Sequence, residues 1–357
     1  MSHRSCSTFA GAVFRFGPRL VVAVLGLLML RAADRCSAAA APYHVVSRWV
    51  VGGEGGWDCL AADPEARRLY VTHGTQVEVL DLDSGKPVGT IPGTAGAHGV
   101  AIAQKLGRGF ITSGRDSAIV VFDLKTLAVT SRLRVPARFP DALLYEPVSN
   151  RVFSFNGGSD NVCAFDAASG AFADSLPLGG TPEFAVADDG RVYVNIESKS
   201  ELVEFDARTL KILHRWPLAP GEEPSGLAID RAHHLLFSGC RNHTLVATDF
   251  KTGKVVGSVP IGDGVDGVEY DARRGLVFSS NGQGSLTVAH QEKSGQFVVV
   301  ENDSTQRGAR TMALDERSGR VFVVTASFGP PPEPTAERPH PRPTILPGTF
   351  TVLVLDR

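Results

Sequence analysis

One pattern recurs along most of this chain and restricts the folds open to it. In the copy between residues 139 and 179, four short apolar runs lie at about residues 142–145, 151–155, 162–166 and 171–178. Segments rich in Gly, Asn, Asp, Ser and Pro separate them, which predicts four strands joined by tight turns in one antiparallel sheet. A single four-stranded sheet cannot bury both of its faces, so the copies must pack against one another.

An aromatic residue in the second run of each copy fixes the period. The seven aromatics are Tyr70, Phe110, Phe153, Tyr193, Phe237, Phe278 and Phe322. Successive members are 40 to 44 residues apart. Four strands per repeat at this period are typical of a β-propeller blade. The sequence therefore predicts an all-β, seven-bladed β-propeller with four-stranded antiparallel blades.

The two ends of the repeat region predict how the ring closes. After Phe322 the chain supplies a third strand at residues 349–355 and ends without a fourth. The segment His44–Val50 resembles the fourth strand of the fourth repeat, at residues 212–218. We expect this N-terminal strand to complete the last blade, because the pairing would remove two exposed strand edges.

Residues 1–40 have the pattern of a secretory signal peptide. Arginines precede an apolar run from Leu20 to Leu30, and small residues follow at 37–40. The apolar run is too short to span a membrane, which favours cleavage after Ala40 over an uncleaved anchor. We therefore expect a single domain, residues 41–357, to be exported to the periplasm or secreted, with no transmembrane helix in the mature protein.

Net charge and cysteine content restrict the classes of partner and the roles of the cysteines. Without residues 1–40 the chain has 31 basic and 37 acidic residues, a formal charge of about −6, and no basic run. This balance argues against nucleic-acid binding. Three cysteines remain, Cys59, Cys163 and Cys240, and we interpret them as small buried apolar residues, with Cys240 alone near a site.

The second strands also carry a resemblance to a known family. Residues 69–73 (LYVTH), 192–195 (VYVN) and 277–281 (VFSSN) are similar to the YVTN repeat of exported seven-bladed propellers. The resemblance covers residues 43–357 and implies the propeller fold. Rings of this kind serve as lactonases, quinoprotein subunits or interaction platforms, so the resemblance implies no single activity.

Comparing the repeats separates residues that the fold requires from residues that it only permits. Six of seven repeats have an acid at the end of the first strand, at Asp63, Glu146, Asp188, Asp230, Asp271 and Asp315. The third strands end at Asp81, Asp123, Asp166, Asp206, Asp249 and Asp356, with His290 as the exception. Acids at these places form turns, so we assign both sets a structural role.

The start of the first strand differs from repeat to repeat. Its seven residues are Asp58, His98, Asp141, Glu183, Ser225, Asp266 and Arg310. Since this strand is innermost in a propeller, we expect the seven side chains to form a ring at one mouth of the central channel. Carboxylates crowded there would shift one another's pKa values unless a ligand bridged them, although a solvated polar rim is the alternative. Trp57 would provide an aromatic wall, and Gly99, Gly226 and Gly267 would let a ligand approach the backbone.

Two classes of function remain open. The first is a binding or interaction protein that holds a small molecule, a metal ion or a protein segment in the ring. The second is a hydrolase resembling lactonase propellers, with His98 or a carboxylate of raised pKa as base and Arg310 stabilising an oxyanion. No nucleophile elbow, phosphate loop or HExxH motif is present. Sequence alone leaves the catalytic residues unknown.

A metal is a further hypothesis for the ring. Asp58, His98, Asp141 and Glu183 come from four consecutive repeats. Oxygen ligands with one imidazole suit Ca²⁺ or Mn²⁺ better than copper or a structural zinc.

The last repeat contains an insertion. From His290 to Asp356 is 66 residues, about 24 more than the period requires. The extra segment, at about 327–346, is rich in proline and favours polyproline II structure. It should start beside Arg310. It is either a surface loop or a flap that folds over the ring, with His340 and Arg342 facing the carboxylates.

Overall fold

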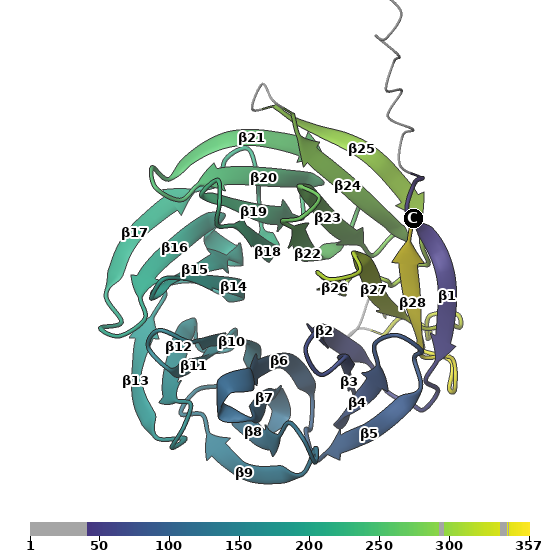
Figure 1. The fold of residues 1–357 in the computed structure, drawn as a ribbon, viewed down its shortest axis with the longest axis horizontal. Helices are drawn as coiled ribbons and strands as arrows, with labels where there is room; N and C mark the ends of the chain where they lie inside the picture. Colours follow the sequence, from purple (N-terminus) through teal and green to yellow (C-terminus); the bar gives the residue numbers. More distant parts are fainter. Residues whose placement is uncertain (1–40, 293–295, 336–340, 342) are drawn as a thin grey trace, which may run out of the picture. The chain divides into compact units, whose positions relative to one another are not determined.

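Seven four-stranded antiparallel sheets surround a central axis in the computed structural model, which describes residues 41–292, 296–335, 341 and 343–357 (Figure 1). The seven-bladed propeller predicted from the repeat is therefore confirmed. The predicted signal peptide lies outside the described residues. Within the described residues, no helix is long and apolar enough to span a membrane.

The first strand of each blade is innermost, and the other three follow outward (Figure 1). Blades one and two consist of β2 (Trp57–Asp63), β3 (Arg68–His73), β4 (Gln76–Asp81), β5 (Pro87–Pro92), β6 (Ala97–Ala103), β7 (Arg108–Ser113), β8 (Ala118–Asp123) and β9 (Val129–Arg134). Blades three and four consist of β10 (Pro140–Glu146), β11 (Arg151–Asn156), β12 (Asn161–Asp166), β13 (Phe172–Pro177), β14 (Pro182–Asp188), β15 (Arg191–Ile196), β16 (Glu201–Asp206) and β17 (Ile212–Pro217).

The remaining blades follow the same order, except that the chain ends supply blade seven together. Blades five and six consist of β18 (Pro224–Asp230), β19 (Leu235–Cys240), β20 (Thr244–Asp249), β21 (Lys254–Pro260), β22 (Val265–Asp271), β23 (Leu276–Asn281), β24 (Ser285–Gln291) and β25 (Phe297–Ser304). Blade seven consists of β26 (Met312–Asp315), β27 (Arg320–Thr325), β28 (Thr351–Asp356) and β1 (His44–Val50). The short 3-10 helices are η1 (Gln104–Leu106), η2 (Gly114–Asp116) and η3 (Glu197–Lys199).

The predicted closure of the ring is confirmed. β1 pairs with β28 in antiparallel register from His44 opposite Asp356 to Val50 opposite Thr351. Just before β1, the buried Tyr43 packs edge-on against Phe278 of blade six, with ring centroids 5.1 Å apart. The N-terminal strand thus covers the edge of β28 and is also tied to the neighbouring blade.

Seven apolar clusters lie in the described chain, one at each junction between neighbouring blades. The aromatic residue that marks each repeat belongs to the cluster shared with the following blade. Tyr70 packs with Phe122 of blade two, and Phe322 of blade seven lies in one cluster with Leu69 of blade one. Each repeat therefore buries its second-strand aromatic against the next repeat, and the last repeat buries its own against the first.

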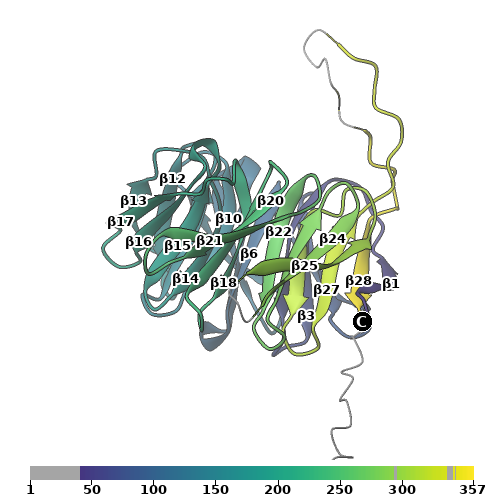
Figure 2. The same ribbon diagram turned by 90° about the horizontal axis from the view of Figure 1, so that it is seen from above.

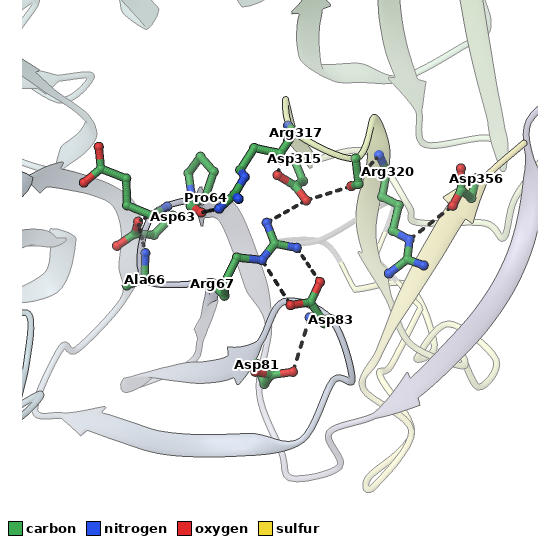
Figure 3. A network of polar contacts seen from close by, with 12 residues as sticks. Asp63, Pro64, Ala66, Arg67, Asp81, Asp83, Asp315, Arg317, Arg320 and Asp356 are labelled. Carbon is green, nitrogen blue, oxygen red and sulfur yellow. Dashed lines mark hydrogen bonds and ion pairs between the residues drawn. The ribbon is translucent and has the colours of Figure 1, made fainter.

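Polar contacts reinforce the junction between blades one and seven (Figure 3). Arg67, in the turn after β2, donates to Asp83 of its own blade and to the fully buried Asp315 of blade seven, the latter at 2.8 Å. Arg317 of blade seven donates to the carbonyl oxygen of Pro64 at 3.0 Å. These bonds connect the turns at one end of the innermost strands across the point where the chain closes.

The turn role assigned to the acids at the strand ends is confirmed for all except Asp188 and Asp356, and Asp356 pairs with Arg320 at 3.1 Å instead. Backbone N–H groups two and three residues further on donate to Asp63 and to Glu146 at 2.6–3.0 Å. At the third-strand ends, Asp166 likewise accepts from the backbone N–H of Ser169 at 2.7 Å. Asp188 lies in a shorter turn and pairs with Arg231 of blade five at 3.4 Å instead.

The insertion lies between β27 and β28, as predicted. Its two ends form a short antiparallel stem, in which Gly329 N donates to Thr344 O at 2.8 Å and Leu346 N donates to Ser327 O at 2.9 Å. Beyond the stem the described part rises from one face of the propeller (Figure 2). His340 and Arg342, expected to face the carboxylates in the flap hypothesis, lie outside the described residues.

Candidate ligand site at the channel mouth

The seven side chains at the start of the innermost strands do gather at one mouth of the channel. In blades one to six the ring residue is the second residue of the innermost strand, and in blade seven Arg310 lies two residues before β26. Most ring residues line one cavity of about 440 Å³, namely Asp58, His98, Asp141, Glu183, Asp266 and Arg310. Ser225 is buried between two of them.

Polar side chains of the second strands hold the backbone at this mouth. The hydroxyl of Thr112 donates to the carbonyl oxygen of Asp141 in the next blade at 2.6 Å. Asn195 Nδ2 donates to the carbonyl oxygen of Ser225 at 2.9 Å. Because these groups are buried, their bonds between blades fix the positions of the ring backbone. This role was not predicted from the sequence, although four repeats carry a polar residue two positions after the aromatic, at Thr72, Thr112, Asn195 and Ser280.

An imidazole and two carboxylates form one half of the ring. His98 Nδ1 lies 2.5 Å from Asp58 Oδ2 and 3.3 Å from Asp141 Oδ1. Burial opposes protonation of His98, but the hydrogen bond to Asp58 and the charge of Asp141 outweigh it and raise the pKa of His98. The imidazole is therefore stabilised in its cationic form.

The other half is organised around Asp266. Arg310 Nε donates to Asp266 Oδ2 at 2.6 Å, and Arg310 Nη2 lies 3.8 Å from Asp58. The buried hydroxyl of Ser225 donates to Asp266 Oδ1 at 2.7 Å and lies 3.4 Å from Glu183. Arg310 thus bridges two of the carboxylates, while Glu183 lies farther from any cation of the ring.

Burial and mutual repulsion leave the carboxylates incompletely compensated. Burial, followed by the charge of Asp58, raises the pKa of Asp141 to about 7. Burial, followed by the charges of Asp141 and Asp266, raises the pKa of Glu183 to about 8. Burial also raises the pKa of Asp266, although Arg310 opposes the shift. Near neutral pH Asp141 and Glu183 therefore hold protons for much of the time, because full ionisation of the ring would place four negative charges against the two positive charges of His98 and Arg310.

The structure corrects the role expected for the glycines and places Trp57 beside the acidic cavity. A Cβ atom on Gly99 would lie 2.8 Å from the backbone nitrogen of Leu143, and one on Gly226 would lie 2.7 Å from the carbonyl oxygen of Asp266. These glycines therefore admit the neighbouring innermost strand, not a ligand, and Gly267 does the same beside blade seven. Trp57 lines a second, adjoining cavity and not the acidic one.

The expectation for the cysteines is confirmed in one part and wrong in another. Cys59, Cys163 and Cys240 are all buried and free. Cys59 lines the acidic cavity, whereas Cys240 packs at the mouth of blade five beside Gly221. Burial, followed by the charge of Asp58, holds the pKa of the Cys59 thiol well above its usual range, so it stays protonated.

Part of the predicted metal set comes together. The ligand atoms of Asp58, His98 and Asp141 lie within 4.8 Å of one another, and Glu183 is outside this group. In this arrangement Asp58 and His98 are hydrogen-bonded to each other. A metal would have to separate them before both could coordinate it.

Comparison with solved structures agrees with the architecture. The chain is similar to the WD40 repeats of RRP9, with 9% identity over 89% of this chain and 98% of that one and a TM-score of 0.72. It is similar to a chain of the mitotic checkpoint complex, with 12% identity over 100% of this chain and 99% of that one and a TM-score of 0.70. A chain of Kuenenia stuttgartiensis hydrazine synthase matches with 12% identity over 75% of this chain and 92% of that one and a TM-score of 0.66.

The fold is a seven-bladed propeller resembling WD40 propellers. At these identities the likeness shows the fold alone. No protein-family model matches the chain, and no curated protein matches it. Because one fold serves many functions, the function has to be argued from the cavity itself.

Proposed function

We propose that this protein is an exported propeller of the YVTN-repeat type that binds a positively charged ligand at the mouth of its central channel. The pattern of residues 1–40 supports export, and the three YVTN-like segments support the family. The observation that carries the binding role is the composition of the acidic cavity. Four ring carboxylates share it with the guanidinium of Arg310 and the imidazole of His98, and burial together with charge repulsion raises the pKa values of Asp141, Glu183 and Asp266.

Charge complementarity gives the physical reason for this ligand. Ionising all four carboxylates in a partly desolvated cavity is unfavourable because the charges repel one another. A bound cation would relieve that repulsion and replace the protons held by Asp141 and Glu183. The other charged lining residues add little, since Arg241 already pairs with Glu197 at 2.7 Å and Asp263 is 68% exposed.

The size of the cavity favours an organic cation over a single metal ion. Its volume of about 440 Å³ falls in the range of roughly 300–1,000 Å³ that small-molecule sites occupy. A primary ammonium can also donate to several carboxylates at once. Ca²⁺ or Mn²⁺ at Asp58, His98 and Asp141 is the alternative, and the same experiment distinguishes the two.

Calorimetry with methylammonium, CaCl₂ and MnCl₂ tests the proposal. We expect methylammonium to bind at pH 8, and Asp141→Asn to weaken binding at least tenfold. Asp174→Asn is a matched control because it removes the same charge from the exposed outer strand of the same blade. Equal affinities of the two variants, or no binding of any of the three cations, would contradict the proposal. Tight binding of Ca²⁺ or Mn²⁺ alone, lost in Asp141→Asn, would assign the site to the metal.

One observation favours a hydrolase as the second candidate. The imidazole of His98 is oriented by Asp58, which is the arrangement of a general base and its positioning carboxylate. A panel of lactones and esters, run with His98→Ala, tests this function. Turnover that His98→Ala abolishes would support the hydrolase, whereas equal rates with and without the protein would leave cation binding as the function.

A further inference from the structure

A second cavity adjoins the acidic one and has a different character. Its volume is about 380 Å³, and it shares Gly264 and Arg310 with the acidic cavity. Its other lining residues are Gly56, Trp57, Gly282, Arg307, Gly308, Phe328, Pro343 and Ile345. An aromatic and aliphatic wall here meets a floor of glycines, so an apolar cavity lies directly beside the acidic one.

The insertion of blade seven builds the apolar wall. Phe328 and Ile345 are paired across its stem, and the Phe328 ring lies 6.0 Å from the ring of Trp57. Trp57 in turn packs against the fully buried Phe350 at 5.5 Å. Gly308, with φ of 87°, leaves room for this wall, because a Cβ atom there would lie 2.7 Å from Phe328. The wall is thus fixed to the core of the propeller.

The charges of the second cavity are opposite to those of the first. Arg307 and Arg310 both line it, and among the described residues no carboxylate does. Two guanidiniums disfavour a second ammonium at this position. They are compatible with an aromatic ring, because the face of a ring attracts cations and an Arg side chain can stack on it.

We infer that the ligand is an arylalkylammonium, a small molecule whose ammonium binds in the acidic cavity and whose aromatic ring binds against Trp57 and Phe328. The inference rests on the proposed cation-binding function and adds the substrate class. Arg310 lies between the two parts and faces both, held by Asp266 on the acidic side. The base of the insertion is therefore the specificity element of the site, and no flap closing over the ring is required.

A series of amines tests the inference. Benzyl-, 2-phenylethyl-, 3-phenylpropyl- and 4-phenylbutylammonium would be compared by calorimetry with methylammonium, butylammonium and 1,4-diaminobutane at pH 8. We expect at least one aryl amine to bind tenfold or more tightly than methylammonium, and the doubly charged diamine to bind more weakly than that aryl amine. An aryl amine that binds no better than methylammonium would overturn the inference and leave the cation site standing.

Variants then locate the aromatic part. Phe328→Ala should remove the advantage of the aryl amine and leave the affinity for methylammonium unchanged. Phe172→Ala, on the outer strand of blade three and 47% exposed, is the matched control and should change neither. Phe328→Leu keeps the packing against Trp57 and replaces the alanine variant if that variant is unstable. It should still lose most of the difference in affinity between the aryl amine and methylammonium. If the aryl amine still binds more tightly than methylammonium in both variants, the inference is overturned. If the wild-type protein does not bind methylammonium, the proposed function is overturned instead.

Discussion

Four of the seven innermost strands carry an acid at both ends, and the acids at the two ends behave differently. The ring residues at the channel mouth and the turn acids at the other end are five positions apart, or roughly 16 Å along a strand. In the turn set, Asp315 accepts from Arg67, Ser318 and the backbone of Arg317 at 2.8, 2.7 and 3.2 Å. Burial opposes its ionisation, but these bonds outweigh burial and hold the pKa of Asp315 below its usual range.

The ring acids have fewer donors and more acidic neighbours. Glu183 has a single contact with a hydroxyl, at 3.4 Å, among the bonds of the described residues. Its pKa is raised, whereas the pKa of Asp315 is lowered. The comparison shows that an acid has a structural role where backbone and arginine donors compensate its charge. It is available to a ligand where it has few donors and acidic side chains of other blades lie nearby.

The largest effect should come from opening the ring. Deleting His44–Val51 exposes the edge of β28 and removes the packing that joins blade seven to its neighbours. We expect loss of the cooperative melting transition or aggregation, seen by calorimetry and size-exclusion chromatography. Replacing residues 327–346 with a short Gly-Ser turn is the control, since it should leave melting almost unchanged. A deleted protein that stayed monomeric with its full melting temperature would contradict the closure.

Single substitutions sharpen the contrast between the two sets. Asp315→Ala leaves the partly buried guanidinium of Arg67 short of a partner and should cost about 3 kcal/mol of unfolding free energy. Asp141→Asn should cost less than about 1 kcal/mol, because it removes a repulsive charge as well as its contact with His98. Denaturant titrations at pH 7 measure both values. If the ring variant proved the more destabilising, the division into structural and ligand-binding acids would be wrong.

The two sets should also differ in the sign of their pH dependence. Asp141 and Glu183 have folded pKa values of about 7 and 8, above the value of about 4 in an unfolded chain, so folding takes up protons between these limits. Their contribution to stability is present at low pH and is lost as pH rises through 7–8; the raised pKa of His98 acts in the same direction. The lowered pKa of Asp315 contributes stability that is lost only as pH falls through its folded value.

We therefore expect the melting temperature to fall between pH 5 and pH 8.5, with a change of about 2–4 °C for each kcal/mol. Glu183→Gln should flatten the curve, and a saturating cation should raise melting more at pH 8 than at pH 5. A melting temperature that rises with pH over this range would show that the ring carboxylates are compensated after all.

The sequence determined the blades, their number, the closure and the membership of the ring. These features follow from the repeat period of the sequence, and the seven repeats can be compared with one another position by position. The turn acids were assigned correctly, apart from Asp188, because their bonds reach only two or three residues along the chain.

Only the tertiary structure decided what the mouth of the channel can bind. Gly99 and Gly226 pack against the next blade, Cys59 replaces Cys240 at the cavity, and Trp57 belongs to a second cavity built by the insertion. None of these follows from spacing in the sequence. They depend on how far one innermost strand lies from the next and on which side chain fills the gap between blades, and those distances are set by packing.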